Sequence, residues 1–306
     1  MKAEVPAEIK ATLPEGRCGK VLGMTPVVMT VVATLLAGLS SSEMTKAQYV
    51  RALAAQLQSK AGDQWGFFQA KRLRGAIQSG ALDTARLTAG DLEPDAAALR
   101  RFAATLPDPA PVLAALDTLL SGQLPAPAAA PALAPEIRTA LAAIDDAAPA
   151  ADIAAALRDV PAATLDSALH AALAHARAFD DLLRPVIEHG DRLGDAIDAS
   201  AEARRALGRD FAVLRLRYSS LRYDAEAKLN QSIARLLDLQ VRQTNLVAER
   251  HQRRSARFFY GMLGAQAAVL VSTFALAARR RSLLWSLAAS AGLVAVTFAT
   301  YVYLFL

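Results

Sequence analysis

The C-terminal part of the chain decides its fold class, and from residue 258 to residue 306 it reads FFYGMLGAQAAVLVSTFALAARRRSLLWSLAASAGLVAVTFATYVYLFL. This stretch contains two uncharged segments, residues 258–278 and 282–306, which are separated by three arginines at 279–281. An α-helix of about 20 apolar residues spans the hydrocarbon core of a bilayer, which is roughly 30 Å thick. The sequence therefore predicts two transmembrane helices that form a tight hairpin.

A third uncharged segment, residues 21–42, follows a polar N-terminal tail of residues 1–20. Pro26 falls in the first turns of the predicted helix, where a missing backbone N–H costs least. A cleaved signal peptide is the alternative, because Gly38 and Ser40 provide small residues at a possible cleavage site. The length of the polar tail favours an uncleaved anchor, so we expect one N-terminal and two C-terminal transmembrane helices.

The composition agrees with a membrane protein and narrows the chemistry. The 306 residues are 54% hydrophobic but only 6% aromatic, which is more apolar than an ordinary soluble domain. The single cysteine, Cys18, excludes an internal disulfide framework and a Cys-based zinc site. The formal charge of +5 could indicate nucleic acid, but the arginines gather beside the apolar segments. We therefore expect a lipid bilayer, and not nucleic acid, as the partner.

Basic residues flank the predicted spans. They are Lys20, Arg250, Arg253, Arg254, Arg257, Arg279, Arg280 and Arg281. Their expected role is to fix the topology, and contact with anionic lipid headgroups is the alternative. Counted by the positive-inside rule, the two sides of the membrane are balanced. The position of Lys20 against the first span, and the difficulty of translocating three adjacent arginines, favour a cytoplasmic N-terminus and an extracytoplasmic central region.

Small residues four apart recur in both C-terminal spans. They are Gly264 and Ala268 in the first span, and Ala288 and Gly292 in the second. This spacing lets helix backbones approach closely in lipid, where the hydrophobic effect does not drive association. We expect these residues to pack the hairpin or neighbouring chains, and the alternative is that an alanine-rich span contains such pairs by composition alone.

The region between the spans is polar and predicted to be helical. Residues 43–80 form a stalk helix in which Gly62 interrupts an approximately helical series of apolar side chains: Tyr49, Leu53, Leu57, Trp65, Phe68 and Leu73. Residues 81–162 are rich in Ala and Pro, which predicts a linker or loosely packed short helices instead of a core. Short helices are expected near residues 96–105, 111–120, 136–146 and 152–159, and no strands are expected.

Residues 163–257 form the second half of the predicted body. A helix over 163–183 is halted by Pro185, and a long amphipathic helix begins near Asp195. Apolar residues between Phe211 and Gln243 step by three or four, as in a coiled-coil stalk. No Gly or Pro follows until the second span, so one helix can continue into it. It is placed to pair antiparallel with the helix of residues 43–80, and pairing with another chain in a homo-oligomer is the alternative.

Two segments, residues 41–75 and 250–304, resemble a bacterial membrane protein family known as domain of unknown function 4337. The most specific strings are DQWGFFQAK at residues 63–71 and RRSARFFYGMLGAQ at residues 253–266. The resemblance implies a helical, multi-pass protein of the bacterial inner membrane and supplies no activity and no catalytic residue. Trp65 is expected to anchor the stalk interface, with a contact to lipid headgroups as the alternative.

The sequence offers no catalytic constellation. It lacks a glycine-rich phosphate loop and the HExxH and GxSxG motifs. His170 and His175 are five apart, which is a poor spacing for a metal site on one helix. Charged residues near Pro185 are expected to be solvated turn residues: Asp180, Asp181, Glu188, His189 and Asp191. We therefore expect no enzyme, cofactor, metal or small-molecule substrate.

The leading hypothesis is an all-α integral membrane protein that acts as a scaffold or an envelope-associated factor. The alternative is an oligomeric channel or transport accessory subunit with the arginines of residues 279–281 at its mouth. Neither C-terminal span carries a charged residue or a polar stripe, which a pore usually needs.

Overall fold

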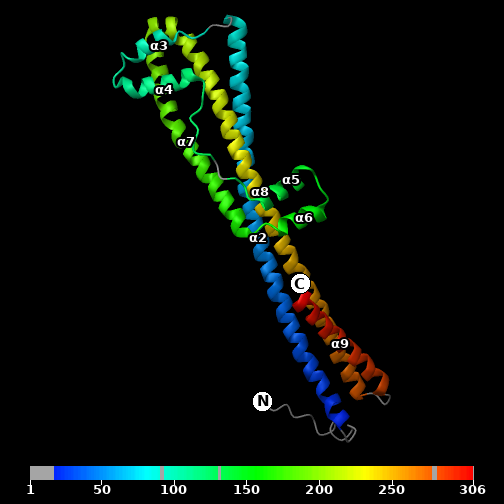
Figure 1. Ribbon diagram of the computed structural model, residues 1–306. Helices are drawn as coiled ribbons and strands as arrows, with labels where there is room; N and C mark the ends of the chain where they lie inside the picture. The colour runs from blue at the N-terminus through cyan, green and yellow to red at the C-terminus, as the bar shows by residue number, and fades with distance from the viewer. Residues whose placement is uncertain (1–16, 90–92, 130–131, 278–280, 306) are drawn as a thin grey trace. The chain divides into compact units, whose positions relative to one another are not determined.

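The computed structural model describes the chain except for residues 1–16, 90–92, 130–131, 278–280 and 306 (Figure 1). The described residues form helices and contain no strand, which confirms the all-helical prediction. The chain divides into two compact units. The terminal unit consists of Met1–Ala54 and Thr244–Leu306, and the central unit consists of Ala55–Gln243.

Two very long helices dominate the fold. Helix α2 covers Arg17–Ala89 (73 residues), and helix α8 covers Ala201–Ala277 (77 residues). The predicted stalk helix of residues 43–80 lies within α2, which continues through Gly62 because one glycine costs only about 1 kcal/mol relative to alanine inside a helix. The prediction that the second helix continues into the apolar segment is confirmed. By length and composition, both α2 and α8 could cross a membrane.

In the terminal unit, helix α9, Arg281–Phe305, packs antiparallel to α8. The Arg257 guanidinium lies 4.7 Å from the centroid of the Tyr301 ring, while Gly264 faces Ala291. Residue numbers that rise along α8 therefore meet falling numbers along α9, as the predicted hairpin requires. A small apolar core joins these two helices to α2: Ala33, Leu36, Phe258, Ala265 and Ala295.

The central unit adds five shorter helices: α3 Ala96–Ala103, α4 Pro109–Ser121, α5 Pro135–Asp145, α6 Ala150–Arg158 and α7 Ala162–Ala199. The first four agree closely with the predicted short helices. The expectation of a loose, coreless segment is nevertheless wrong, because Leu99, Val112 and Leu116 are fully buried against α7 and α8. Prolines lie at the first positions of α4 and α5, where they favour helix initiation, and so do not disrupt this packing.

Helix α7 does not stop at Pro185, as the sequence predicted, but continues to Ala199. A proline inside a helix costs about 3 kcal/mol. The flanking side chains Leu183 and Val186 are buried in the core of the central unit, and burying one such side chain contributes about 1.5–3 kcal/mol. The break occurs instead at Ser200, which is extended and whose hydroxyl accepts a hydrogen bond from the backbone N–H of Ala203, 3.2 Å away. The long helix therefore begins at Ala201 and not near Asp195.

Small residues at seven-residue spacing form the buried face of α2. In the terminal unit they are Ala33, Ser40, Ala47 and Ala54, and in the central unit Ala61 and Gly75 continue the series. The predicted apolar face is wrong at Tyr49, Leu53 and Leu73, which are 72%, 41% and 63% exposed. Small side chains allow two helices to approach closely, and the larger side chains Tyr49, Leu53 and Leu73 lie outside this close contact.

Candidate functional site

A buried charge cluster joins α2 and α8 in the central unit. Glu226 of α8 is 8% exposed, and its carboxylate pairs with the Lys71 ammonium of α2. The other carboxylate oxygen lies 3.5 Å from Nε of Arg222. Both cations also approach the Tyr223 ring, with Lys71 Nζ at 5.5 Å and Arg222 Cζ at 4.5 Å from its centroid. Two cations therefore neutralise a single buried carboxylate inside the helix pair, and both cations also lie near the Tyr223 ring.

Two neighbouring groups respond to this environment. Partial desolvation, with the negative charge of Glu226, raises the pKa of Asp180 on α7. Burial raises the pKa of the Tyr218 phenol to about 12. The pair of Lys71 with Glu226 joins α2 to α8, so the physical role that this arrangement supports is electrostatic attraction between the two helices.

The family-like string DQWGFFQAK ends with Lys71 of this cluster, and its residues Trp65 and Phe68 lie one to two turns along α2 from it. The Trp65 indole N–H donates a hydrogen bond to Asp238 Oδ2 of α8 at 2.9 Å. The Trp65 ring also meets the Phe68 ring edge to face at 5.6 Å between centroids. Together with Lys71, these residues connect α2 to α8, so the structure agrees with the interpretation of Trp65 as an anchor of the stalk interface.

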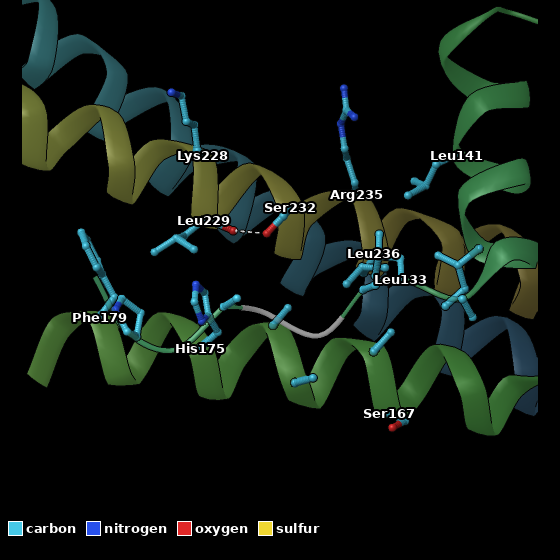
Figure 2. Close-up of a pocket in the computed structure, with 18 of the residues that line it drawn as sticks. Leu133, Leu141, Ser167, His175, Phe179, Lys228, Leu229, Ser232, Arg235 and Leu236 are labelled. Carbon is cyan, nitrogen blue, oxygen red and sulfur yellow. Dashed lines mark hydrogen bonds between the residues drawn. The ribbon is translucent and has the colours of Figure 1, made fainter. Parts of the chain in front are cut away.

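A groove of about 1210 Å³ lies in the central unit between α7, α8 and the segments 124–129 and 132–134 (Figure 2). Its lining is mainly alanine, leucine and proline, and among the described lining residues the ionisable ones are His175, Lys228 and Arg235. In Figure 2, the side chains of Lys228 and Arg235 extend from α8 away from α7, so their charged groups lie at the edge of the groove and not among its apolar lining residues. Arg235 pairs with Asp145 of α5 at 3.3 Å.

A second polar contact lies in the terminal unit, where α2 and α8 again run antiparallel. The hydroxyls of Ser40 and Ser255 are buried and each donates to the backbone carbonyl of the other, at 3.0 and 2.8 Å. One turn along, Glu43 lies 2.7 Å from His251 Nδ1 and 2.8 Å from Lys46 Nζ. Burial alone would raise the pKa of Glu43, but the hydrogen bonds from His251 and Lys46 outweigh it and lower the pKa.

The residues predicted to pack the C-terminal hairpin all lie at close helix contacts in the terminal unit. A side chain added at Gly264 would place its Cβ 3.4 Å from the carbonyl oxygen of Ala291 on α9. Ala268 and Ala288 are buried. Gly292 faces α2, where an added Cβ would lie 3.2 Å from the Met29 side chain. The small residues therefore serve contacts with two different neighbours and not the hairpin alone.

The predicted membrane-flanking basic residues differ in their surroundings. Arg253 pairs with Glu249 at 3.3 Å, and Arg257 lies over the Tyr301 ring. Arg250 is exposed, whereas Arg254 is half-buried. Lys20 lies within α2, and Arg281 begins α9. Arg279 and Arg280 fall outside the described residues.

Metal binding finds no support in the part of the chain that is described. Within it, no group of three or more His, Cys, Asp or Glu side chains is arranged to hold a metal ion. His175 lines the apolar groove, and His251 contacts Glu43. Sequence reasoning missed the pairs of Glu43 with His251 and of Lys71 with Glu226, whose members are far apart along the chain.

Comparison with known proteins gives one match. Residues 19–108 match the family model described as Domain of unknown function (DUF4337). The match includes residues 41–75 and confirms the resemblance of that segment, while residues 250–304 lie outside it. No curated protein and no solved structure matches the chain. The family description assigns no activity.

Proposed function

We propose that this protein is a non-enzymatic scaffold of the bacterial inner membrane. In this proposal residues 21–42, 258–278 and 282–306 cross the bilayer, and α2 and α8 each continue from a span into the central unit. The seven-residue spacing of buried small residues on α2 supports a coiled-coil body. The lipid bilayer is the first partner.

The proposal rests on the distribution of side chains in the terminal unit, where small residues lie inside and large apolar residues lie outside. Its interior is built from small side chains such as Ala265, Ala268 and Ala295, which are fully buried. Its large apolar side chains face outward: Val31 is 55% exposed, Leu35 63%, Leu270 61%, Phe274 67% and Leu293 69%. Monomeric soluble proteins rarely expose such a continuous apolar surface. In lipid, outward apolar side chains are solvated by acyl chains, and small interior residues permit close packing.

The central unit has the opposite arrangement, which supports a location outside the lipid. Leu99, Leu116 and Leu193 are fully buried in its core, and ion pairs lie on its exposed helix faces. Glu43 lies on α2 just after the outward-facing apolar side chains of residues 21–42, and its carboxylate contacts His251 and Lys46. The proposed boundary of the first span is therefore at residue 42.

The channel alternative has less support than the scaffold. A pore requires polar groups or a water-filled path through the bundle. In the described part of the terminal unit, the interior is closely packed alanine, serine, leucine and phenylalanine. The orientation proposed from the sequence, with the N-terminus and residues 279–281 in the cytoplasm, places the central unit outside the cytoplasm.

Alkaline carbonate extraction of native membranes, combined with cysteine labelling, tests the proposal. In a Cys18→Ser background, Tyr49→Cys introduces a thiol at a 72% exposed position beyond the first span, and Leu35→Cys introduces one within it. We expect the full chain to stay in the membrane pellet. A membrane-impermeant maleimide should label Tyr49→Cys in intact spheroplasts and should fail to label Leu35→Cys until detergent is added.

Four outcomes decide the proposal. Release of the full chain by carbonate overturns it, as does labelling of Leu35→Cys in intact membranes at the rate of Tyr49→Cys. Labelling of Tyr49→Cys only in inverted vesicles supports the spans and overturns the orientation. Turnover of a substrate that is lost on mutation of the Glu226 cluster overturns the non-enzymatic role.

A further inference from the structure

The outer face of α2 in the central unit carries a second apolar pattern that its contact with α8 does not use. Seven positions step alternately by four and three residues along this face, and we call them the α2 seam: Gly66, Ala70, Leu73, Ile77, Gly80, Thr84 and Leu87. All seven are exposed, and none is charged. The buried residues Gly75 and Leu82 lie on the opposite side of the helix. This face therefore has the heptad pattern of an interface without a partner.

The exposure of the α2 seam is large. Leu73 is 63% exposed, Ile77 is 58% and Leu87 is 88%. A side chain built at Gly66 or Gly80 would meet nothing within 4 Å. The Thr84 hydroxyl donates to the carbonyl oxygen of Gly80 at 2.8 Å, so it is satisfied within the helix. Among the residues that the structure describes, none covers this face.

We propose that the α2 seam binds the α2 seam of a second copy of this chain, in a parallel two-stranded pair. The residue types favour this geometry. In heptad terms, the a positions are Ala70, Ile77 and Thr84, and the d positions are Gly66, Leu73, Gly80 and Leu87, so β-branched residues stand at two a positions and Leu at two d positions. A β-branched residue at a with Leu at d favours parallel dimers. The parallel direction also rests on the proposed membrane anchor, because two copies anchored in one bilayer extend α2 from the same side.

The residues that flank the α2 seam are compatible with a parallel pair. In that register Gln69 of one copy lies beside Arg74 of the other, and Asp83 lies beside Thr88. A carboxamide can accept a hydrogen bond from a guanidinium. The Thr88 hydroxyl donates to the Thr84 carbonyl oxygen at 2.9 Å, and Asp83 pairs with Arg86 of its own helix at 3.6 Å. No like charges face each other across the pair, so the flanking positions impose no repulsion.

The size of the contact predicts a reversible dimer. A helix from residue 66 to residue 87 is about 33 Å long and about 10 Å wide. The contact therefore covers roughly 330 Å² on each copy, compared with about 800 Å² per partner in a standard stable complex. Anchoring both copies in one membrane raises their effective concentration, which compensates for the small area. We expect pairing in the membrane and dissociation on dilution into detergent.

Site-directed cysteine cross-linking in native membranes tests the inference. In the Cys18→Ser background, single substitutions Leu73→Cys, Ile77→Cys and Leu87→Cys place thiols on the seam, and Arg72→Cys provides an exposed control off the seam. A disulfide needs Cα atoms 4.4–6.8 Å apart, a separation that in-register residues at the centre of a parallel pair reach. We expect dimers from all three seam positions and at least tenfold less from Arg72→Cys.

The alternatives give different patterns. An antiparallel pair would cross-link only at Ile77→Cys, near the middle of the seam, and would overturn the parallel geometry. Equal cross-linking at all four positions would show random collision, and no cross-linking at the seam would remove the second copy as its occupant.

A second variant separates loss of pairing from loss of folding. Leu73→Glu combined with Ile77→Glu should abolish the cross-link at Leu87→Cys, while far-UV circular dichroism stays unchanged because both side chains are exposed. An undiminished cross-link would overturn the inference. Carbonate extraction of the same samples tests the membrane anchor independently: a chain that stays in the pellet without seam cross-links retains the proposed function and loses only the dimer.

Discussion

Replacing Lys71 by methionine should weaken the central unit measurably, because it leaves the Glu226 carboxylate inside the helix pair with one cation fewer. The Glu226 side chain is only 9% exposed and that of Lys71 is 29% exposed, so solvent screens their interaction incompletely. Removing one partner of a buried ion pair costs about 3–5 kcal/mol. Arg222 remains near the carboxylate, so we expect Lys71→Met to lower the free energy of unfolding by about 2–3 kcal/mol.

This loss can be read from the thermal midpoint. A change of 1 kcal/mol shifts Tm by about 2–4 °C in a domain of 150–250 residues. The expected decrease is therefore about 4–12 °C. The sequence contains two tryptophans, so the fluorescence of Trp65 in a Trp285→Phe background reports on the central unit, since Trp65 contacts Asp238 within it. The full chain in detergent micelles is the sample.

A double-mutant cycle decides whether the pair itself causes the loss. In Lys71→Met combined with Glu226→Gln, the carboxylate that lost its Lys71 partner is replaced by a neutral amide, so no uncompensated negative charge is left at position 226. We expect the double variant to be less destabilised than the sum of the single variants by at least about 1 kcal/mol. The matched control is Arg100→Met, since Arg100 and Asp117 form an exposed pair that should not change Tm. Additive single effects, or equal losses in Lys71→Met and the control, would refute the reasoning.

Three further predictions concern the core, the close helix contacts and pH. Leu116→Ala should cost about 2–5 kcal/mol because this side chain is fully buried in the central core, and a negligible loss of Tm would show that the segment is loosely packed. Gly264→Leu should lower the free energy of unfolding by about 1–3 kcal/mol through overpacking, and so lower Tm. Gly38→Leu should leave Tm unchanged, because a side chain at position 38 meets nothing within 4 Å. Equal Tm values for the two variants would contradict the close contact at Gly264. The lowered pKa of Glu43 gives stability above its unfolded value of 4.5 that is lost as the pH falls through the folded value. Wild type should therefore exceed Glu43→Gln in Tm at neutral pH and lose that advantage on acidification, and a pH-independent difference would count against the hydrogen-bonded carboxylate.

The sequence predicted the helical elements better than their faces. Proline positions and helical spacing located the short helices of the Ala/Pro-rich segment, but Leu116 was not expected in a core because the surrounding alanines suggested little area to bury. On α2, the search for large apolar side chains selected Tyr49 and Leu53, which are exposed, and passed over Ala47 and Ala54, which are buried. Where two helices approach closely, the small volume of a side chain, and not its hydrophobicity, determines whether it lies on the buried face.

The charged contacts were harder to predict for a different reason. Glu43 and His251 are 208 residues apart, and a single chain gives no register for helices separated by that distance. One signal is nevertheless present. Glu43 follows Ser40 by three positions, and Glu226 adjoins the buried Ala227, so each carboxylate lies beside a small residue of the interface. A carboxylate buried at a helix interface requires a positive charge on the facing helix, and this requirement would have restricted the possible alignments of α2 against α8.

The two faces of α2 explain why the string DQWGFFQAK mixes large, small and charged residues without forming a catalytic site. On one face Trp65, Phe68 and Lys71 belong to the contact with α8, through the bond to Asp238 and the pair with Glu226. On the other face Gly66 and Ala70 begin the α2 seam. A helix that contacts α8 on one face and presents small residues on the opposite face needs large and small side chains within each turn. If Gly66 and Ala70 serve contact with a second copy, Gly66→Gln and Ala70→Gln should reduce cross-linking at Leu73→Cys. The same variants should leave Tm and the contacts of Lys71 and Trp65 intact. A fall in Tm with unchanged cross-linking would instead assign these positions to folding of the single chain.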